Sequence, residues 1–454
     1  MKIFILLGIL LSISNNISAQ LNEIWLQNVE NNFDVRPKPN INCDLDKNIV
    51  VSSGNYLMKY DTLGNEIWVN ELETNPYNYS SKYGNEQVCL DYENNIYTIS
   101  KELIYEDFDL TYSIVNTKKF APNGDLIWYT QYEYDVETLN TGTVININNN
   151  SIYITGECKS GFAEEDSTNL FLVSYDVLTG EENWRQTYRK NSDYWIEGMK
   201  IIFDEEGYVY VGANANISTD KEYVLLKYDT DGNLIWDRRY NSDMYLSAYT
   251  FDMVLTSENT IVMSGSYFST VCFSLDGEQL WEIMPPSNIT SNVYGDRTHD
   301  MIAMNNGDVI LTGYYTDISP SFTNSQMYTL RISTEGEILW DVKYGTNVYD
   351  FDDYAYAISQ DNLGNIIIGG SVSGVIPDTD GNYYNVSALV AYDSETGEML
   401  WDYYINNFGS TEGGRIYSIY ADSNGSMYTA GISYSGTPNA YFTKKYRYPG
   451  LFLN

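Results

Sequence analysis

The chain has 454 residues, of which 62 are acidic and 25 basic, for a formal net charge of −37. Such a charge repels nucleic acid and anionic lipid, so the sequence predicts partners of neither kind. Tyrosine is abundant at 44 residues, and Ile, Val and Thr are plentiful, a composition that favours strands over helices. The charge is typical of a well-solvated exported protein; the alternative is attraction of Ca²⁺ or a cationic partner.

Residues 1–19 have the pattern of a secretory signal peptide. A lysine precedes an apolar run from Ile3 to Ile13, polar residues follow, and a small residue stands at Ala19. The run is too short to cross a bilayer, and no later stretch approaches the roughly 20 apolar residues that a membrane helix needs. We therefore expect a protein that is secreted, or held in the periplasm or at the cell surface, with residues 20–454 as its one domain.

A phrase of turn residues ending in tryptophan recurs along the chain, as in YDTDGNLIW and FAPNGDLIW. Seven copies are complete, and a shortened one, LNEIW, follows the signal peptide. Successive tryptophans are 43 to 61 residues apart, the length of one four-stranded propeller blade with variable loops. A large ring with one N–H is suited to packing between neighbouring blades. We expect this blade-docking role for Trp25, Trp68, Trp128, Trp184, Trp236, Trp281, Trp340 and Trp401.

A second phrase, of two short strands around an Asn/Asp/Gly turn, occurs eight times, as in IIFDEEGYVYVG and IYADSNGSMYTAG. Each copy is typical of a β-hairpin. The tryptophan phrase supplies another hairpin, so each repeat makes four antiparallel strands. The sequence predicts an all-β protein, a single closed β-propeller of eight four-stranded antiparallel blades, with seven blades as the alternative.

The last repeat is split between the two ends of the chain. The C-terminal YFTKKYRYPGLFLN matches the third strand of a repeat but lacks the tryptophan phrase that should follow. Residues 21–25 are a fourth strand without its predecessor. We expect this N-terminal strand to pair with residues 441–446 and complete the last blade, which removes the open sheet edges that invite aggregation.

Residues 391–401, AYDSETGEMLW, resemble the A-x-D-x-x-T-G-x-x-x-W docking motif of the PQQ-like, quinoprotein alcohol dehydrogenase-like eight-bladed propellers. Residues 175–184 match nearly as well, and the other copies keep Gly and Trp but mostly lose Thr. Quinone-dependent members use an adjacent Cys–Cys pair, a Ca²⁺ held by Glu and Asn, and an Asp base, whereas this chain has no adjacent cysteines. The resemblance implies a non-catalytic member, similar to scaffold propellers that help assemble other proteins at membranes.

The four cysteines are too few for a disulfide framework. Cys43 and Cys89 fall at similar places in consecutive repeats, which leaves one bridge or two free thiols as alternatives. Asp378 and Asp380 are the residues best placed for a cation, but a calcium loop needs more acidic ligands and a distal Glu. We expect no cofactor, with Ca²⁺ as the alternative.

Residues entering the inner strands would line the mouth of a central channel, on the face where the variable connections emerge. They read as an acidic funnel with three arginines, suited to a cation, a sugar or a basic peptide; solvated loop surface is the alternative. A single histidine excludes multi-His metal sites and His-based triads. The candidate ligand-binding residues are Trp195, Glu197, Asp296, Arg297, His299, Asp350, Asp352, Asp353, Glu412 and Arg415.

The sequence predicts a non-catalytic binding or scaffold propeller, a monomer, that presents its variable loop face to a protein or a glycan. The alternative is an enzyme, either a divergent quinoprotein or a carboxylate-based glycan hydrolase or lyase. Carboxylates with strongly perturbed pKa values in a deep funnel would favour the enzyme. No catalytic residue is predicted.

Overall fold

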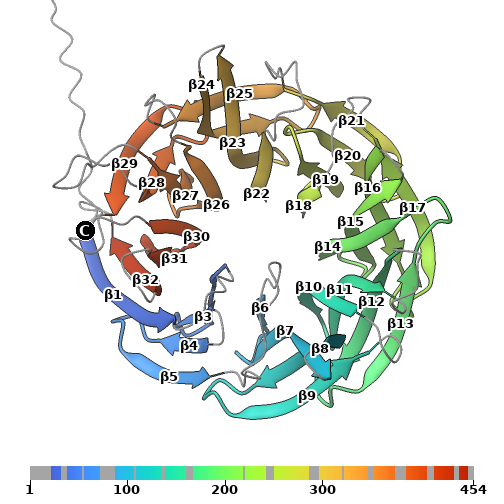
Figure 1. The fold of residues 1–454 in the computed structure, drawn as a ribbon. Helices are drawn as coiled ribbons and strands as arrows, with labels where there is room; N and C mark the ends of the chain where they lie inside the picture. The colour runs from blue at the N-terminus through green and yellow to red at the C-terminus, as the bar shows by residue number, and fades with distance from the viewer. Residues whose placement is uncertain are drawn as a thin grey trace, which may run out of the picture.

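The computed structural model is a ring of eight four-stranded sheets (Figure 1). It contains 32 strands, and the described residues include no helix. Each blade is antiparallel, and its strands follow the chain from the centre of the ring outward. The predicted all-β, eight-bladed fold is confirmed. The structure describes residues 22–31, 38–53, 56–71, 87–106, 109–133, 139–159, 167–217, 220–241, 250–285, 296–319, 322–345, 352–373, 385–405, 414–433 and 439–447.

The first four blades follow each other in chain order. Blade 1 is β2 (Asn40–Cys43), β3 (Ile49–Ser53), β4 (Tyr56–Tyr60) and β5 (Glu66–Glu71). Blade 2 is β6 (Val88–Leu90), β7 (Ile96–Glu106), β8 (Asp109–Phe120) and β9 (Leu126–Tyr132). Blade 3 is β10 (Leu139–Asn148), β11 (Ser151–Lys159), β12 (Asn169–Asp176) and β13 (Glu182–Tyr188). Blade 4 is β14 (Trp195–Phe203), β15 (Val209–Ile217), β16 (Asp220–Tyr228) and β17 (Leu234–Tyr240).

The other four blades complete the ring. Blade 5 is β18 (Thr250–Leu255), β19 (Thr260–Gly265), β20 (Thr270–Ser274) and β21 (Gln279–Ile283). Blade 6 is β22 (Arg297–Ala303), β23 (Val309–Ser319), β24 (Phe322–Ile332) and β25 (Ile338–Tyr344). Blade 7 is β26 (Tyr354–Gln360), β27 (Ile366–Val372), β28 (Val386–Tyr392) and β29 (Met399–Ile405). Blade 8 is β30 (Gly414–Ala421), β31 (Ser426–Ser433), β32 (Asn439–Arg447) and β1 (Asn22–Asn31).

The two ends of the chain meet in blade 8. Strand β1 pairs antiparallel with β32, with Trp25 opposite Lys445 and Val29 opposite Tyr441, so the N-terminal strand forms the outer edge of the last blade (Figure 1). This is the pairing that the split repeat predicts. Residues 1–19 lie outside the described residues, and their assignment as a signal peptide stays a prediction.

Burial explains why the strands stack as they do. The second and third strands are buried along most of their length, as in β27 and β28, whose seven residues are all buried. The outermost strands alternate, as in β13. Each apolar cluster joins two blades: Tyr153 of blade 3, for instance, packs with Val211 and Leu226 of blade 4. The core is therefore a series of interfaces between blades rather than one central core.

The tight hairpin turns are built by a side chain at their first residue. Asp229 Oδ1 accepts from the amides of Asp231 (3.0 Å) and Asn233 (2.8 Å), and Gly232 has a φ of +83°. Any side chain at Gly232 would be strained by that φ, and a Cβ there would approach Trp184 to 2.5 Å. The D-x-x-G pattern is thus explained by turn geometry and blade contact.

The indole N–H groups join neighbouring blades through backbone carbonyls. Five indoles donate to a carbonyl in the 3–4 turn of the next blade, at 2.8 to 3.2 Å. Trp236 instead lies under the Arg238 guanidinium, which donates to Gly277 O of the next blade. Trp401 is buried against blade 8. The side chain of Trp25 lies outside the described residues. The five donor–acceptor pairs are Trp68–Pro122, Trp128–Val177, Trp184–Thr230, Trp281–Thr334 and Trp340–Ser394.

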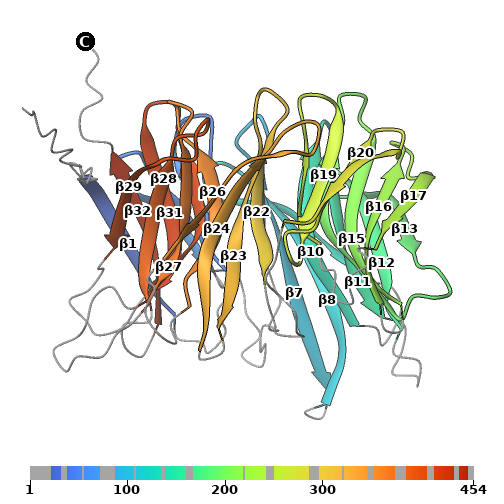
Figure 2. The ribbon, with the colours of Figure 1, turned by 90° about the horizontal axis from the view of Figure 1, so that it is seen from above.

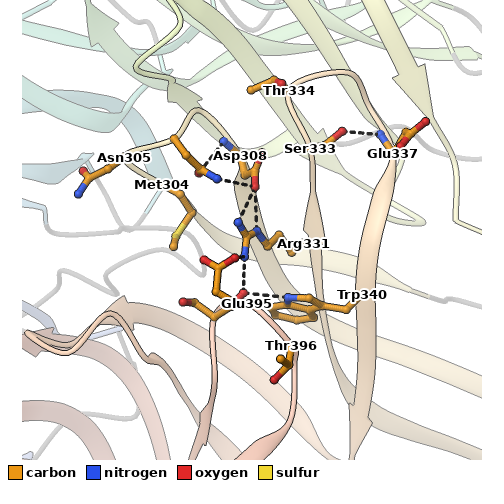
Figure 3. A network of polar contacts seen from close by, with 12 residues as sticks. Met304, Asn305, Asp308, Arg331, Ser333, Thr334, Glu337, Trp340, Glu395 and Thr396 are labelled. Carbon is orange, nitrogen blue, oxygen red and sulfur yellow. Dashed lines mark hydrogen bonds and ion pairs between the residues drawn. The ribbon is translucent and has the colours of Figure 1, made fainter.

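A basic side chain on the third strand reinforces this contact in five blades. In three of these blades, the basic side chain and the indole of the tryptophan donate to the same carbonyl. Arg331 donates to Ser394 O at 2.6 Å, the carbonyl that also accepts from Trp340, while its other nitrogens bind Asp308 at 2.7 to 2.9 Å. Figure 3 shows Arg331 between Asp308 and Trp340. We call this arrangement the carbonyl clamp. Its basic members and their acceptors are Lys59–Pro122, Lys119–Val177, Lys227–Leu275, Arg331–Ser394 and Lys445–Thr62.

Trp340→Ala should lower the free energy of unfolding by about 3 to 5 kcal/mol, because a ring that is 9% exposed is replaced by a cavity between two blades. Trp340→Phe should cost less, since it mainly removes the bond to Ser394. The control is Tyr129→Ala on an outer strand, where the ring is 60% exposed and the change should stay within about 0.5 kcal/mol. Equal losses in urea unfolding for the two alanine variants would contradict the docking role.

Candidate functional site

The first strand of each blade surrounds the axis of the ring (Figure 1). Because consecutive strands are antiparallel, the two tight turns of each blade lie on one face and the two variable connections on the other. Figure 2 shows β7 and β8 reaching beyond the other strands on that second face. The inner strands begin at this face, so the residues at their starts lie where the variable connections meet the axis.

Six of the eight inner strands carry a β-bulge at the same position. In β22, for example, the register with β23 shifts between Thr298 and Asp300, which leaves His299 as the extra residue. A bulge re-aims the side chain of its unpaired residue and raises the local twist. The extra residues are Thr143, Met199, Phe251, His299, Tyr356 and Tyr417.

In three inner strands, the residue after the bulge accepts a hydrogen bond from an amide of the next blade. Asp252 accepts from the Met301 amide (3.0 Å), Asp300 from the Ile358 amide (3.0 Å), and Ser418 from the Ile41 amide (3.2 Å). These bonds satisfy buried backbone donors between blades. We call Asp252, Asp300 and Ser418 the inner belt, and these bonds give its two acids a structural role.

Lys200 is the cation that pairs with Asp252 of the inner belt. Its Nζ lies 2.5 Å from Asp252 Oδ1. Burial alone lowers the pKa of Lys200, but the Asp252 carboxylate outweighs burial, so the pKa lies above its ordinary value. Burial, followed by the charge of Asp252, raises the pKa of Asp300 to about 8. The raised pKa favours the protonated form of Asp300, which lowers the repulsion between the two acids.

Four tyrosines and one histidine form a continuous aromatic group at the axis, which we call the axial aromatic cluster. His299 stacks on Tyr356 with centroids 5.0 Å apart and planes at 13°, and Tyr356 is 4.8 Å from Tyr417. Tyr354 links Tyr356 (6.0 Å) to Tyr314 (4.7 Å). His299, Tyr354, Tyr356 and Tyr417 are half-buried, so solvent reaches the centre of the ring at this point.

Three cations lie against the axial aromatic cluster. Lys38 Nζ is 6.0 Å from the ring centre of Tyr356 and 5.9 Å from that of Tyr417. Arg415 lies 6.0 Å from the same Tyr356 ring. Arg297 lies 5.5 Å from the ring centre of Tyr314, and both residues belong to blade 6. Each distance is within the range of a cation–π contact.

These cations also act on each other and on the histidine. Desolvation by the surrounding protein lowers the pKa of Lys38, and the charges of Arg297 and Arg415 lower it further, whereas the charge of Asp300 raises it. Burial and the charge of Lys38 lower the pKa of His299 to about 3, so the imidazole is neutral. Its Nδ1 lies 2.6 Å from Ala355 O, a carbonyl that can only accept. The proton is therefore assigned to Nδ1, and Nε2 is an acceptor.

A second polar group lies on blades 2 to 4, across the axis (Figure 1). Trp195 donates from Nε1 to Glu157 Oε2 at 2.5 Å. Burial raises the pKa of Glu157, and burial with the Glu157 charge raises that of Glu197 to about 8. The pKa of Lys101 lies below its ordinary value, because burial lowers it more than the charges of the two glutamates raise it. The structure thus brings Trp195 and Glu197 together with two residues that the sequence does not single out.

Three acids that precede inner strands accept hydrogen bonds from backbone amides, and two of them, Asp296 and Asp353, do so within their own blade. Asp296 accepts from the Thr316 amide (2.5 Å), and burial raises its pKa to about 6. Asp353, which is 0% exposed, accepts from the Ser373 amide (2.6 Å).

Asp352 binds the Ser325 amide (3.0 Å) and the hydroxyl of Tyr354 (2.9 Å). Asp296 and Asp353 are buried, whereas Asp352 is exposed, and all three serve as acceptors for backbone amides. A ligand-binding role for these acids stays a prediction. Asp350, Glu412, Asp378 and Asp380 lie outside the described residues. The candidate cation site at Asp378 and Asp380 therefore stays a prediction.

The cysteines belong to four different blades and are free thiols, so the bridge between Cys43 and Cys89 is not formed. Burial raises the pKa of Cys43, and burial raises that of Cys89 as well. Such thiols are poor nucleophiles. Within the described ranges, no group of three His, Cys, Asp or Glu side chains is arranged to hold a metal ion. No helix in the same ranges is long and apolar enough to span a membrane.

The sequence matches the family described as outer membrane protein assembly factor BamB over residues 118–403, from β8 to β29. That range is more than half of the chain. The protein belongs to this BamB family. No curated protein matches the sequence.

Two solved structures are similar to this member of the BamB family. Quinohemoprotein alcohol dehydrogenase from Comamonas testosteroni is similar, with a TM-score of 0.59 and 14% identity over 95% of this chain and 78% of the other. BamB from Moraxella catarrhalis has a TM-score of 0.49 and 10% identity over 94% of this chain and 100% of the other. At such identities the likeness shows the fold alone.

The described residues of this BamB-family protein do not fit the quinone site that the sequence resemblance implies for catalytic members. That site needs adjacent cysteines, and the free cysteines here stand in separate blades. No reaction step through a quinone is derived.

Sequence reasoning singled out Arg297, His299 and Arg415 but missed Lys38 and the tyrosines beside them. The available signal was the alternation along β26 and β30, where half-buried aromatic or basic residues alternate with buried small or apolar ones. The bulge conceals this alternation, because it shifts the pattern by one residue.

Glu197→Gln should change how stability depends on pH. The folded-state pKa of Glu197 is about 8, above its ordinary value of 4.5, so folding retains a proton in this window. The contribution of this group to stability is present at low pH and falls as pH rises through 8. The variant should therefore gain stability relative to wild type between pH 5 and pH 9. Urea unfolding at both pH values tests this.

The control for this titration is Glu181→Gln, at an exposed turn position. Its difference from wild type should stay constant over the same range. If the stability difference between Glu197→Gln and wild type were also independent of pH, neither burial nor the charge of Glu157 would raise the pKa of Glu197.

Proposed function

We propose that this BamB-family protein is an exported, monomeric, non-catalytic binding propeller that presents the axis end of its variable face to a protein or a glycan. The observation that carries the proposal is the axial aromatic cluster with its three cations. Aromatic rings supply contact area at low entropic cost, and a few polar groups fix orientation, which is the usual composition of a binding site. No cofactor takes part in the proposed function.

The family supports this proposal. BamB is described as an assembly factor of the outer membrane, and a propeller that works by assembly needs a stable surface rather than a reaction centre. The carbonyl clamp joins the outer strands of neighbouring blades, and the inner belt joins the inner strands. Side chains at the starts of the inner strands are thus carried on a rigid frame, as precise recognition requires.

A second candidate function has a specific observation in its favour. Burial raises the pKa of Glu157, and burial with the charge of Glu157 raises the pKa of Glu197 to about 8, which favours the protonated form of Glu197. A protonated acid beside a second carboxyl group is the pairing that glycan-cleaving enzymes use. This arrangement supports a carboxylate-based hydrolase or lyase as the alternative.

Binding should depend on the axial aromatic cluster. A glycan-array screen and a pull-down with the mature protein should each be run with wild type, with Tyr356→Ala/Tyr417→Ala, and with Tyr129→Ala, whose ring is exposed on β9. The proposal expects at least one ligand that the double variant loses by about tenfold or more and that Tyr129→Ala retains.

Thermal melts of all three proteins check that the fold is kept. Depolymerisation of a bound glycan that stops in Glu197→Gln would instead establish the enzyme. Retained binding of every ligand by the double variant would overturn the proposed site.

A further inference from the structure

The tight turns of the blades lie on the face opposite the end at which β7 and β8 extend (Figure 2). Such a turn is specified by an acceptor at its first residue and by a residue with positive φ near its end. In the outer turn of blade 1, Asp61 accepts from the amides of Leu63 and Asn65 at 2.8 Å, and Gly64 has a φ of +85°. The side chain at the tip of the turn adds nothing to this geometry. The fold therefore does not account for an apolar side chain at that position.

Exposed apolar tips are concentrated in blades 1 and 2. Leu45 is 65% exposed, Leu63 73% and Tyr92 90%, and we call these three residues the apolar turn patch. Among the described turns, blades 3 and 7 each have one exposed leucine, Leu178 and Leu363. The corresponding tips of blades 4, 5 and 6 are polar, so an apolar tip is not a requirement of the repeat. Exposed residues at those tips include Glu205, Asp231, Ser257, Asp276, Asn305 and Glu335.

The inner turns that carry Leu45 and Tyr92 are held against each other. Asn94 of blade 2 accepts at Oδ1 from the Leu45 amide at 2.9 Å and donates from Nδ2 to Asp46 Oδ2 at 3.1 Å. The carbonyl clamp from blade 8 holds the outer turn that carries Leu63. A partner therefore meets a preformed surface, and little conformational entropy of this chain is lost on binding.

The charge around the apolar turn patch decides what kind of partner fits it. Asp46 and Glu93 are exposed, and each follows an apolar tip in the sequence. Lys47, which is half-buried, is the only basic residue of the tight turns that the structure describes. A second copy of this acidic chain, an anionic lipid surface and a nucleic acid would each be repelled. A macromolecule that covers these apolar side chains therefore has to bring positive charge together with apolar surface.

We infer that the apolar turn patch, together with Asp46 and Glu93, docks a polypeptide segment of a partner protein in which basic residues stand beside apolar ones. Leu45, Leu63 and Tyr92 contact the apolar side chains, and the two carboxylates attract the cations. Exposed apolar residues with a polar rim are typical of protein interaction sites, and tyrosine is enriched in them. The inference goes beyond the proposed function, because it places a second binding surface on the opposite face. A scaffold that brings two partners together needs two such surfaces.

The test is fluorescence anisotropy of a short labelled peptide of alternating lysine and leucine, titrated with the mature protein. One control peptide has glutamate in place of lysine, and the other has serine in place of leucine. The lysine–leucine peptide should bind at least about tenfold more tightly than either control, because the site requires both charge and apolar contact. Its affinity should fall as salt rises. No binding of this peptide, or equal binding of either control peptide, overturns the inference.

The apolar contribution is measured with two variants of unchanged charge. Leu45→Ser/Leu63→Ser/Tyr92→Ser should weaken peptide binding about tenfold or more, whereas Leu178→Ser/Leu363→Ser should leave it within about twofold of wild type. Non-specific attraction to the acidic protein is the same in both variants. Both should melt at the temperature of wild type, because the replaced side chains are exposed. Equal affinities of the two variants, or a lower melting temperature in the first alone, would show that the patch is not a docking surface.

The electrostatic contribution is measured with two variants of equal net charge. Asp46→Asn/Glu93→Gln should weaken peptide binding and reduce its salt dependence, whereas Glu205→Gln/Asp231→Asn, at exposed turn positions of blade 4, should have a smaller effect. Equal effects would mean that the whole acidic surface attracts the peptide, and the assignment to blades 1 and 2 would then be wrong.

The remaining outcomes concern the occupant and the place of binding. Self-association in sedimentation, or binding of anionic vesicles, that is lost in Leu45→Ser/Leu63→Ser/Tyr92→Ser would assign the patch to a second copy or to a membrane and overturn the inference. Tyr356→Ala/Tyr417→Ala should retain the peptide, since the axial aromatic cluster belongs to the other face. Loss of the peptide in that variant would place it at the axis and overturn the inference, while the proposed function would stand.

Discussion

The ring depends on a backbone carbonyl that two side chains of the preceding blade share. Val177 O accepts from the indole of Trp128 at 3.2 Å and from the ammonium of Lys119 at 3.0 Å. The same turn carries Gly180, whose Cβ, if present, would meet the Trp128 ring at 2.8 Å. Turn conformation, ring packing and hydrogen bonding are therefore coupled at one point. Among the described residues, three blade contacts have such a shared carbonyl and others use an indole or a basic side chain alone. The core can therefore be divided among blade interfaces, and the sheets need no common centre.

Docking at the outer strands leaves the axis available for recognition. The inner strands are tied by a belt of side chains such as Asp252 and Asp300, which follow the bulges and bind amides of the next blade. The bulge residues themselves, including His299 and Tyr356, lie beside the cations. Acids such as Asp61, Asp229 and Asp393 accept from turn amides, whereas the binding chemistry proposed at the axis is cationic and aromatic.

The repeat made the fold predictable from the sequence. The site was less predictable, because the sequence does not show in which direction its side chains point. Turn residues and tryptophans recur at blade length, so the blade number and the pairing of β1 with β32 follow from counting. Asp296 and Asp353 were expected at a common mouth because they precede inner strands, yet both are buried and accept from amides of their own blade. Whether such an acid turns outward depends on which amide lacks a partner. That is a property of the folded blade and is not visible in the sequence of a repeat.

The carbonyl clamp can be tested by a double-mutant cycle between Lys119 and Trp128 in the free energy of unfolding. With Lys119→Met or Trp128→Phe alone, Val177 O keeps one donor, whereas the double variant leaves it with neither of the two. Our account predicts that the double variant loses more stability than the two single variants together, by about 0.5 kcal/mol or more. Losses that add within about 0.3 kcal/mol would contradict a shared acceptor as the basis of blade docking.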